Sequence, residues 1–212
     1  GEMMNKYKVC VYAISKNEEK FVERWVNSMK EADALYVLDT GSTDNTIKLL
    51  TDLGVEVTQE VINPWRFDVA RNKSLELVPL DTDICVCTDL DEVFEPGWRE
   101  KLENVWNKNV DRVSYTYNWS FDECGNPATT FMQNKIHARK GYSWYHPVHE
   151  ILKTKPNEIE VSCENLVLNH YPDNTKSRSN YLPLLEMSVE EDPTDDRNMH
   201  YLGREYMYYG KW

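Results

Sequence analysis

The sequence predicts an α/β fold, in which a doubly wound and mostly parallel sheet is followed by an antiparallel hairpin region and C-terminal helices. Two observations predict it. In the first 90 residues, short apolar runs alternate with segments of helical periodicity. Between positions 113 and 138, apolar and polar residues then alternate around a break rich in turn residues, as expected for a hairpin. A chain of 212 residues has room for one large domain and an appendage.

The first 90 residues are expected to form four strands joined by three helices. The strands are expected at 9–14, 34–38, 55–58 and 83–88. The helices are expected at 18–30 with Asn17 as cap, from Thr43 or Asp44 to Gly54, and at 68–78. The run 83–88 is almost entirely apolar, which is typical of a central strand covered on both faces. Right-handed crossovers would then place a ligand crevice beyond the carboxyl ends of these strands.

The rest of the chain is expected to complete this domain and to begin a second one. Strands at 113–121 and 129–138 would form the hairpin, and 158–169 adds a further strand. Helical periodicity follows at 177–190 and 197–212. We therefore predict a catalytic domain at 1–172 and a helical extension at 173–212.

Charge and composition exclude several classes of function. A formal net charge of -12 argues against a nucleic-acid partner, because binding a polyanion needs a basic face. No run of about 18 apolar residues occurs, so no transmembrane segment is expected. The five cysteines are odd in number and lack a CxxC pair, which favours free thiols in a reducing compartment. We expect a cytoplasmic protein, either free or peripheral to the inner membrane.

Three polar clusters follow three of the expected strands, at 15–18, 39–44 and 88–92. In the last cluster, Asp89 and Asp91 stand one residue apart after a buried strand, where two carboxylates repel each other unless a cation lies between them. A Mn or Mg ion that also binds a diphosphate fits this pattern. The cluster at 39–44 is equally consistent with an ordinary strand-to-helix turn. It is not a Walker A loop, because no GxxxxGK[ST] sequence is present.

Two further segments carry candidate site residues. Arg71 and Asn72 precede the central strand, where Arg71 could reach a diphosphate or a base or could simply be solvated. Later, His149 and Glu150, with His170, offer a third metal ligand and a general base. The alternatives are that these histidines are ordinary core or surface groups, and that Glu150 pairs with an arginine such as Arg139.

In combination and order, the segments 16–18, 39–44, 71–72 and 88–92 resemble those of family 2 glycosyltransferases, which have the GT-A fold. The most similar branch contains bacterial lipopolysaccharide core glucosyltransferases and transferases with tetratricopeptide repeats. The resemblance covers residues 7–106, and 144–152 resembles a later His-Glu segment of that branch. Within 199–206, Leu202, Gly203 and Tyr206 also resemble the start of a tetratricopeptide helix, with Met199 in place of its tryptophan.

The resemblance implies roles for individual residues. Asp89 and Asp91 would bind a Mn or Mg ion. From the residue types alone, one of His149 and His170 is expected as a further metal ligand, and Glu150 is expected as the catalytic base. The first strand departs from the family by lacking a common proline before Ser15. The nucleotide sugar would be held by Ser15, Asn17, Glu18, Asp39, Gly41, Ser42, Arg71, Asp89 and Leu90.

The function implied is metal-dependent transfer of a sugar, with inversion, from a nucleotide diphosphate sugar such as a UDP-sugar. The acceptor would be a glycan, a lipid-linked glycan or a peptide. One alternative is nucleotidyl transfer, although 15–18 is a poor match to the Gly-rich basic loop that it requires. The other is a catalytically inactive module that binds nucleotides or proteins, against which the presence of all the acidic clusters argues.

Overall fold

The computed structural model describes residues 5–173, 187 and 191 and organises them around one large sheet. The expected helices at 177–190 and 197–212 and the proposed extension at 173–212 therefore fall almost entirely outside the described residues. The elements in chain order are β1 (Val9–Ser15), α1 (Glu19–Met29), β2 (Ala34–Asp39), α2 (Thr46–Asp52), β3 (Glu56–Gln59), α3 (Phe67–Glu76), β4 (Ile84–Cys87), β5 (Glu92–Phe94), α4 (Trp98–Val105), β6 (Arg112–Phe121), β7 (Pro127–Ala138), β8 (Trp144–Tyr145), β9 (Ile151–Leu152) and β10 (Glu160–His170).

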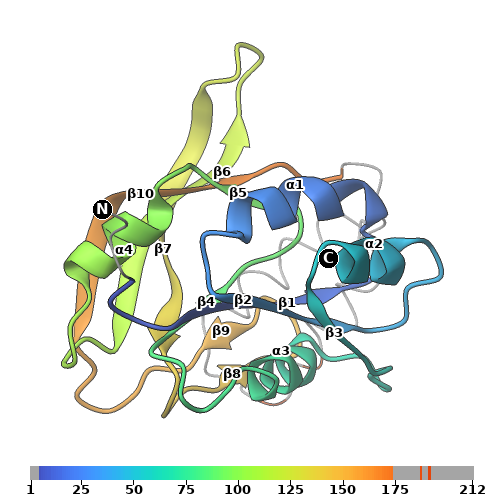
Figure 1. Cartoon of the computed structure of the whole chain (residues 1–212), viewed down its shortest axis with the longest axis horizontal. Coiled ribbons are helices and arrows are strands. Elements are labelled where there is room, and N and C mark those ends of the chain that lie inside the picture. The colour runs from blue at the N-terminus through green and yellow to red at the C-terminus, as the bar shows by residue number, and fades with distance from the viewer. Residues whose placement is uncertain (1–4, 174–186, 188–190, 192–212) are drawn as a thin grey trace.

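The sheet has eight strands in the order β3-β2-β1-β4-β7-β6-β10-β5 (Figure 1). The strands β1 to β4 are parallel to one another, as predicted. The antiparallel part begins where β7 pairs with β4, and it continues through the β6–β7 hairpin. A parallel pairing of β10 with β6 and an antiparallel edge strand, β5, complete the sheet.

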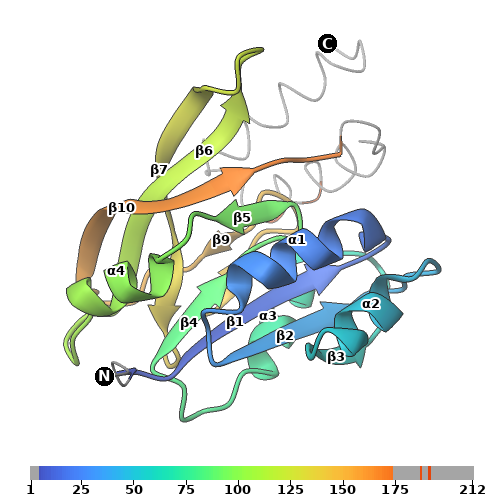
Figure 2. The same ribbon diagram turned by 45° about the horizontal axis from the view of Figure 1, so that its top comes forward.

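Helices cover both faces of the parallel part, as a doubly wound fold requires (Figure 2). Val9 and Val11 of β1 point into a core that also contains Trp25 of α1 and Trp98 of α4. The alternate residues Cys10 and Tyr12 point to the other face, where they pack with Leu75 of α3 and Trp144 of β8. Because β1 is buried on both sides, its sequence is apolar at nearly every position.

The β6–β7 hairpin extends beyond the rest of the sheet (Figures 1 and 2). Within 5–173, none of the helices has the length and apolar character needed to span a bilayer. The five cysteines are free, as expected, and Cys85 and Cys87 are buried on one face of β4.

Several elements were absent from the sequence prediction. These are β5, β8 and β9, each of two or three residues, and the eight-residue helix α4. The predicted cap of the first helix is also wrong, because the N-cap of α1 is Glu18 and no side chain caps it. The predicted cap of the second helix, Thr43 or Asp44, is wrong as well, because the N-cap of α2 is Asn45 and no side chain caps it. The Asp44 carboxylate still accepts a hydrogen bond from the Thr46 amide at 2.9 Å.

Candidate active site

The carboxyl ends of β1 and β2 lie side by side, with Ser15 paired in register with Asp39. The Asp39 carboxylate is fully buried. One oxygen accepts hydrogen bonds from the amides of Gly41 and Ser42 at 3.0 and 2.8 Å. The other accepts them from the hydroxyls of Ser15 and Ser42 at 2.7 and 2.6 Å. Asp39 therefore shapes the loop after β2, in which the predicted nucleotide-binding residues Gly41 and Ser42 lie.

The loop after β1 is joined to the loop after β2 by reciprocal hydrogen bonds. The Asn17 side chain accepts one from the Thr43 amide at 2.8 Å, and the Asn17 amide donates one to the Ser42 hydroxyl at 2.8 Å. The Glu18 amide donates to the Thr46 hydroxyl at 2.9 Å. Asn17 adopts a left-handed conformation with φ of 52°, which asparagine tolerates better than most residues. This explains why its side chain serves the neighbouring loop and does not cap α1.

Arg71 of α3 links two of the predicted site carboxylates. Its guanidinium donates hydrogen bonds to Asp89 and, at 3.0 Å, to Glu150. Its side chain is 4% exposed, and its charge lies 5.7 Å from the centre of the Trp144 ring. Burial opposes ionisation of Asp89, but the charge of Arg71 outweighs it, so the pKa of Asp89 is lowered. Arg71 is thus a buried member of the site, and it, not Arg139, is the arginine that pairs with Glu150.

Asp91 and His170 meet at the end of the sheet, where β5 and β10 pair. His170 Nε2 lies 3.2 Å from one oxygen of Asp91, and Nδ1 lies 3.0 Å from the Trp119 carbonyl. Burial lowers the pKa of His170, but the hydrogen bond and charge of Asp91 outweigh it and raise the pKa to about 9. The other Asp91 oxygen, Oδ1, is buried and has no hydrogen-bond partner among the described residues. Such an orphaned acceptor is unusual and needs an explanation.

Glu92 is a buried carboxylate that the sequence did not single out as a primary site residue. It accepts hydrogen bonds from the Asp89 amide at 2.7 Å and from the Tyr117 hydroxyl. Burial, followed by the negative charge of Asp89, raises the pKa of Glu92 to about 7. A pKa in this range suits a group that exchanges protons near neutral pH.

The remaining predicted residues are spread around this cluster. The Leu90 side chain packs in the core, so any nucleotide contact there falls to its backbone. His149 lies in the loop between β8 and β9, half-buried and with φ of 50°. Within the described part of the chain, no three His, Cys, Asp or Glu side chains gather closely enough to hold a metal ion. The structure thus brings Asp91 and His170 together without joining Asp89 and His149 to them.

Lys135 is another site residue that sequence reasoning missed. Its ammonium lies 5.8 Å from the centre of the Trp144 ring, and its charge acts on both Asp89 and Glu92. The alternation of β7 could have identified it, because Lys135 and His137 are two apart and His137 pairs in register with Cys85 of the central strand.

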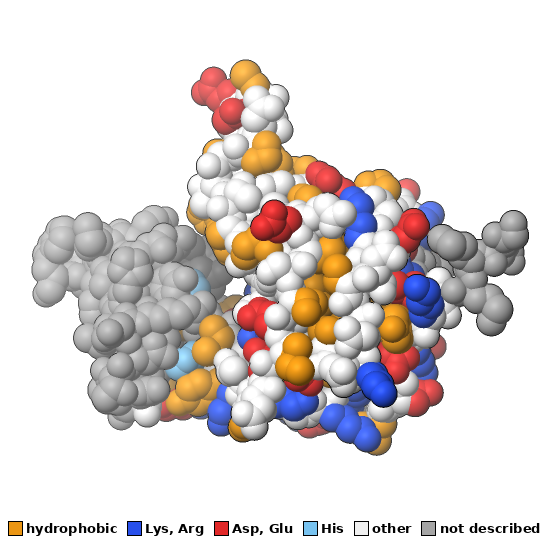
Figure 3. Space-filling view, turned by 90° about the vertical axis from the view of Figure 1, so that its left-hand side faces the viewer, with side chains coloured by type: hydrophobic (Ala, Val, Ile, Leu, Met, Phe, Trp, Pro, Cys, Tyr) orange, Lys and Arg blue, Asp and Glu red, His pale blue; other side chains and the backbone are white. Residues whose placement is uncertain are grey.

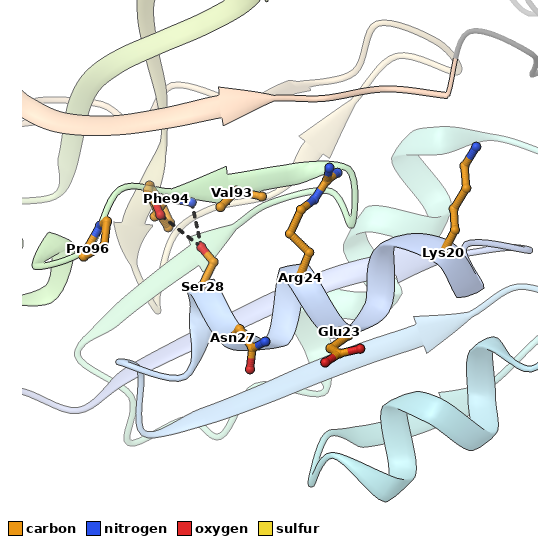
Figure 4. A pocket seen from close by; sticks show the side chains of 8 residues that line it. All are labelled: Lys20, Glu23, Arg24, Asn27, Ser28, Val93, Phe94 and Pro96. Carbon is orange, nitrogen blue, oxygen red and sulfur yellow. Dashed lines mark hydrogen bonds between the residues drawn. The ribbon is translucent and has the colours of Figure 1, made fainter. Parts of the chain in front are cut away.

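A separate open groove of about 550 Å³ lies between α1 and the segment around β5 (Figure 4). It is formed by Lys20, Arg24 and Ser28 of α1 with Phe94 and Pro96, among others. It contains none of the residues predicted to bind the nucleotide or the metal.

Comparison with known proteins decides the family. The family model described as Glycosyl transferase family 2 matches residues 10–156. The chain belongs to glycosyltransferase family 2. The match includes the clusters after β1, β2 and β4 as well as Glu150.

Relatives of this family 2 chain include uncharacterized glycosyltransferases of Rickettsia. The one from Rickettsia bellii (strain RML369-C) is 32% identical over 114 residues, which are 53% of this chain and 37% of the relative. The one from Rickettsia typhi (strain ATCC VR-144 / Wilmington) is 30% identical over 107 residues, or 50% of this chain and 35% of the relative. The matched region is therefore little more than a third of these relatives' length.

Similar solved structures include glucosyl-3-phosphoglycerate synthase from Mycobacterium tuberculosis. Its complex with phosphoglyceric acid gives a TM-score of 0.58 at 15% identity, covering 87% of this chain and 78% of that one. Its complex with Mn2+, UDP and glucosyl-3-phosphoglycerate gives 0.54 at 18%, covering 79% and 73%. At this identity the likeness shows the fold alone, and it confirms the expected GT-A architecture.

Proposed function

We propose that this family 2 chain transfers a sugar, with inversion, from a nucleotide diphosphate sugar to an acceptor hydroxyl, using a divalent cation bound beside Asp91. A UDP-sugar is the donor that we expect. The observation that carries the proposal is the buried and unpartnered Oδ1 of Asp91, which lies next to His170 at the carboxyl edge of the sheet.

The chemistry of this pair fits a hard or borderline cation such as Mn2+ or Mg2+. The Trp119 carbonyl can only accept a hydrogen bond, so Nδ1 of His170 carries a proton and a neutral ring presents its lone pair at Nε2. A proton lies between Nε2 and the Asp91 oxygen in the metal-free protein, and a bound cation would take the place of that proton. A cation with two protein ligands would keep several coordination positions for oxygens of the diphosphate. It would also neutralise the charge on the departing diphosphate.

The loops after β1 and β2 support binding of the nucleoside. They are joined by hydrogen bonds before any ligand arrives, so little conformational entropy remains to be lost on binding. Ser15, Asn17, Glu18, Asp39, Gly41 and Ser42 remain the proposed contacts. Arg71 would act beside them mainly by holding Asp89 and Glu150 in place.

Inverting transfer requires one base that takes the proton of the incoming hydroxyl. Glu150 is the base that we propose, because Arg71 holds it close to Asp89 at the rim of the same cluster. Glu92 is the nearest competitor, although its side chain is buried and accepts two hydrogen bonds.

The test is a panel of nucleotide sugars, each incubated with the protein and Mn2+. Thermal stabilisation identifies the donor, and release of the nucleoside diphosphate in the presence of candidate acceptors measures transfer. We expect one UDP-sugar to stabilise the protein most strongly. If no member of the panel stabilises the protein or is turned over, the proposed function is wrong.

A further inference from the structure

We infer that the acceptor is a neutral sugar, which packs its ring on an aromatic platform formed by Trp119 and Phe131 of the β6–β7 hairpin. This inference rests on the proposed function and names the chemical class of the acceptor. Both side chains are large and apolar, yet Trp119 is 49% and Phe131 is 47% exposed.

The register of the sheet places this platform on the same face as the proposed metal site. His170 of β10 pairs with Glu92 of β5. On its other side, β10 pairs with β6 so that Asn169 lies opposite Asn118, which brings the next residues, His170 and Trp119, next to each other. Side chains of paired residues lie on one face of a sheet. The rings of Trp119 and His170 accordingly stack, with centroids 6.4 Å apart and planes at 19°.

Phe131 joins the platform through the neighbouring strand. It pairs in register with Tyr117, and their rings meet edge to face with centroids 5.3 Å apart. Tyr117 in turn donates a hydrogen bond to Glu92. The platform is therefore anchored at both ends to residues beside Asp91, and its outer faces remain open.

An open aromatic face suits the apolar side of a sugar ring, whose C–H groups carry partial positive charge and meet the negative face of the π system. Two hydroxyl side chains, Ser120 and Thr129, pair in register next to Trp119 on the hairpin. Groups of this kind can exchange hydrogen bonds with sugar hydroxyls. An exposed apolar patch with a polar border is a common feature of ligand-binding grooves.

The charge of the hairpin disfavours an anionic acceptor. The sequence from 113 to 134 contains no lysine or arginine, whereas it contains Asp122 and Glu123. In the view of Figure 3, the projecting hairpin carries hydrophobic and acidic side chains and no basic ones on its upper part. The adjacent Asp91 and Glu92 add further carboxylates. A phosphate or carboxylate on the acceptor would therefore find no Lys or Arg of the segment 113–134 as a counter-charge.

The experiment measures binding of four neutral disaccharides, namely cellobiose, maltose, lactose and chitobiose, by saturation-transfer NMR with Mn2+ and UDP present. The anionic probe is 3-phosphoglycerate. We expect at least one disaccharide to bind the wild-type chain and 3-phosphoglycerate to bind far more weakly. Trp119→Ala should weaken the disaccharide by about tenfold, as loss of a stacking partner typically does, and Trp119→Phe should restore part of the affinity.

Met132→Ala is the matched control, because Met132 is 45% exposed and adjacent to Phe131 but faces Thr116 on the opposite side of the hairpin. It should bind the disaccharide normally. The inference is overturned if none of the disaccharides binds, if Trp119→Ala and Phe131→Ala both bind like the wild type, or if 3-phosphoglycerate binds as tightly as the sugars.

Titration of UDP into the wild-type chain and Met132→Ala keeps this result separate from the proposed function. If UDP binds with Mn2+ but no disaccharide does, only the platform is wrong. If disaccharide binding depends on Trp119 while UDP fails to bind, the platform stands and sugar transfer from a nucleotide is wrong.

Discussion

The loops after β1 and β2 differ from the turn after β4 in how fully their polar groups are satisfied. In the first region, Asp39 accepts four hydrogen bonds and Asn17 ties the two loops together. In the second, Asp91 Oδ1 has no hydrogen-bond partner within the described residues, and the pKa of Glu92 is raised to about 7. The comparison indicates that the hydrogen bonds of the first region are complete within the chain, whereas the second leaves an acceptor open for the cation that we propose.

The largest effect should come from removing the proposed base. Glu150→Gln keeps the size of the side chain and an acceptor for Arg71 but removes basicity. Turnover should fall by about 10²- to 10⁴-fold, with nucleotide-sugar affinity changed only a few-fold. Steady-state kinetics would measure both quantities, with the exposed Glu60→Gln as control. Near-normal turnover in Glu150→Gln together with a large loss in Glu92→Gln would move the base to Glu92.

A smaller effect is expected from Asp91→Asn, which removes the charge that we propose binds the cation. Affinity for UDP in Mn2+ should fall by about 10- to 100-fold. Calorimetric titration gives this affinity, and Asp52→Asn, an exposed residue paired with Lys48, is the control. Equal UDP affinity in Asp91→Asn and the wild type would show that Asp91 does not hold a cation.

Asp39→Ala should remove the hydrogen bonds that hold the loops after β1 and β2, and should therefore lower the stability of the protein. Four donors lose their acceptor, so the free energy of unfolding should fall by about 1 to 3 kcal/mol in denaturant titration. UDP binding should weaken as well, because the loop that carries Gly41 and Ser42 loses its shape. If stability falls but UDP binds normally, Asp39 forms the turn and has no part in nucleotide binding.

The smallest effect concerns a histidine outside the two regions. His137 is fully buried, donates from Nδ1 to the Ala138 carbonyl and accepts at Nε2 from the Tyr12 hydroxyl, each at 2.7 Å. Burial lowers the pKa of His137 to about 3. Below pH 6.5 the imidazole of His137 takes up a proton in the unfolded chain but not in the folded one. The stabilisation that His137 provides is therefore complete above that pH, and the free energy of unfolding falls by about 1.4 kcal/mol per pH unit as the pH decreases below it.

The measurement for His137 is the pH dependence of the free energy of unfolding between pH 6.5 and 5. His137→Gln can still accept a hydrogen bond from Tyr12 but does not titrate. The free energy of unfolding of the wild type should fall more steeply with decreasing pH than that of His137→Gln, by about 1.4 kcal/mol per pH unit. Identical slopes would mean that His137 takes up its proton in the folded state.

Much of the fold was predictable because, in each long strand or helix, the spacing of the apolar residues shows which of its faces are buried. Strand β4 is covered on both faces and is apolar throughout, and the long strands β6 and β7 alternate. Strands β5, β8 and β9 are too short to show a period. The clusters after β1, β2 and β4 were predictable because parallel strands end at the same edge.

The environment of each site residue was less predictable, since it depends on contacts between distant segments. Glu92 has a raised pKa because it is buried beside the negative charge of Asp89, and the hydroxyl that donates a hydrogen bond to it belongs to Tyr117, 25 residues away. Asn17 resembles a helix cap in the sequence, but its side chain bonds Thr43, which lies 26 residues away. Local patterns contain no information on such contacts.

The most direct test of the central claim is calorimetric titration of UDP into the wild-type chain, first with Mn2+ and then with EDTA. The account predicts clear binding in Mn2+ and a large loss of affinity in EDTA, because Asp91 and His170 would then lack the cation that joins them to the diphosphate. Equal affinity in the two conditions would contradict it.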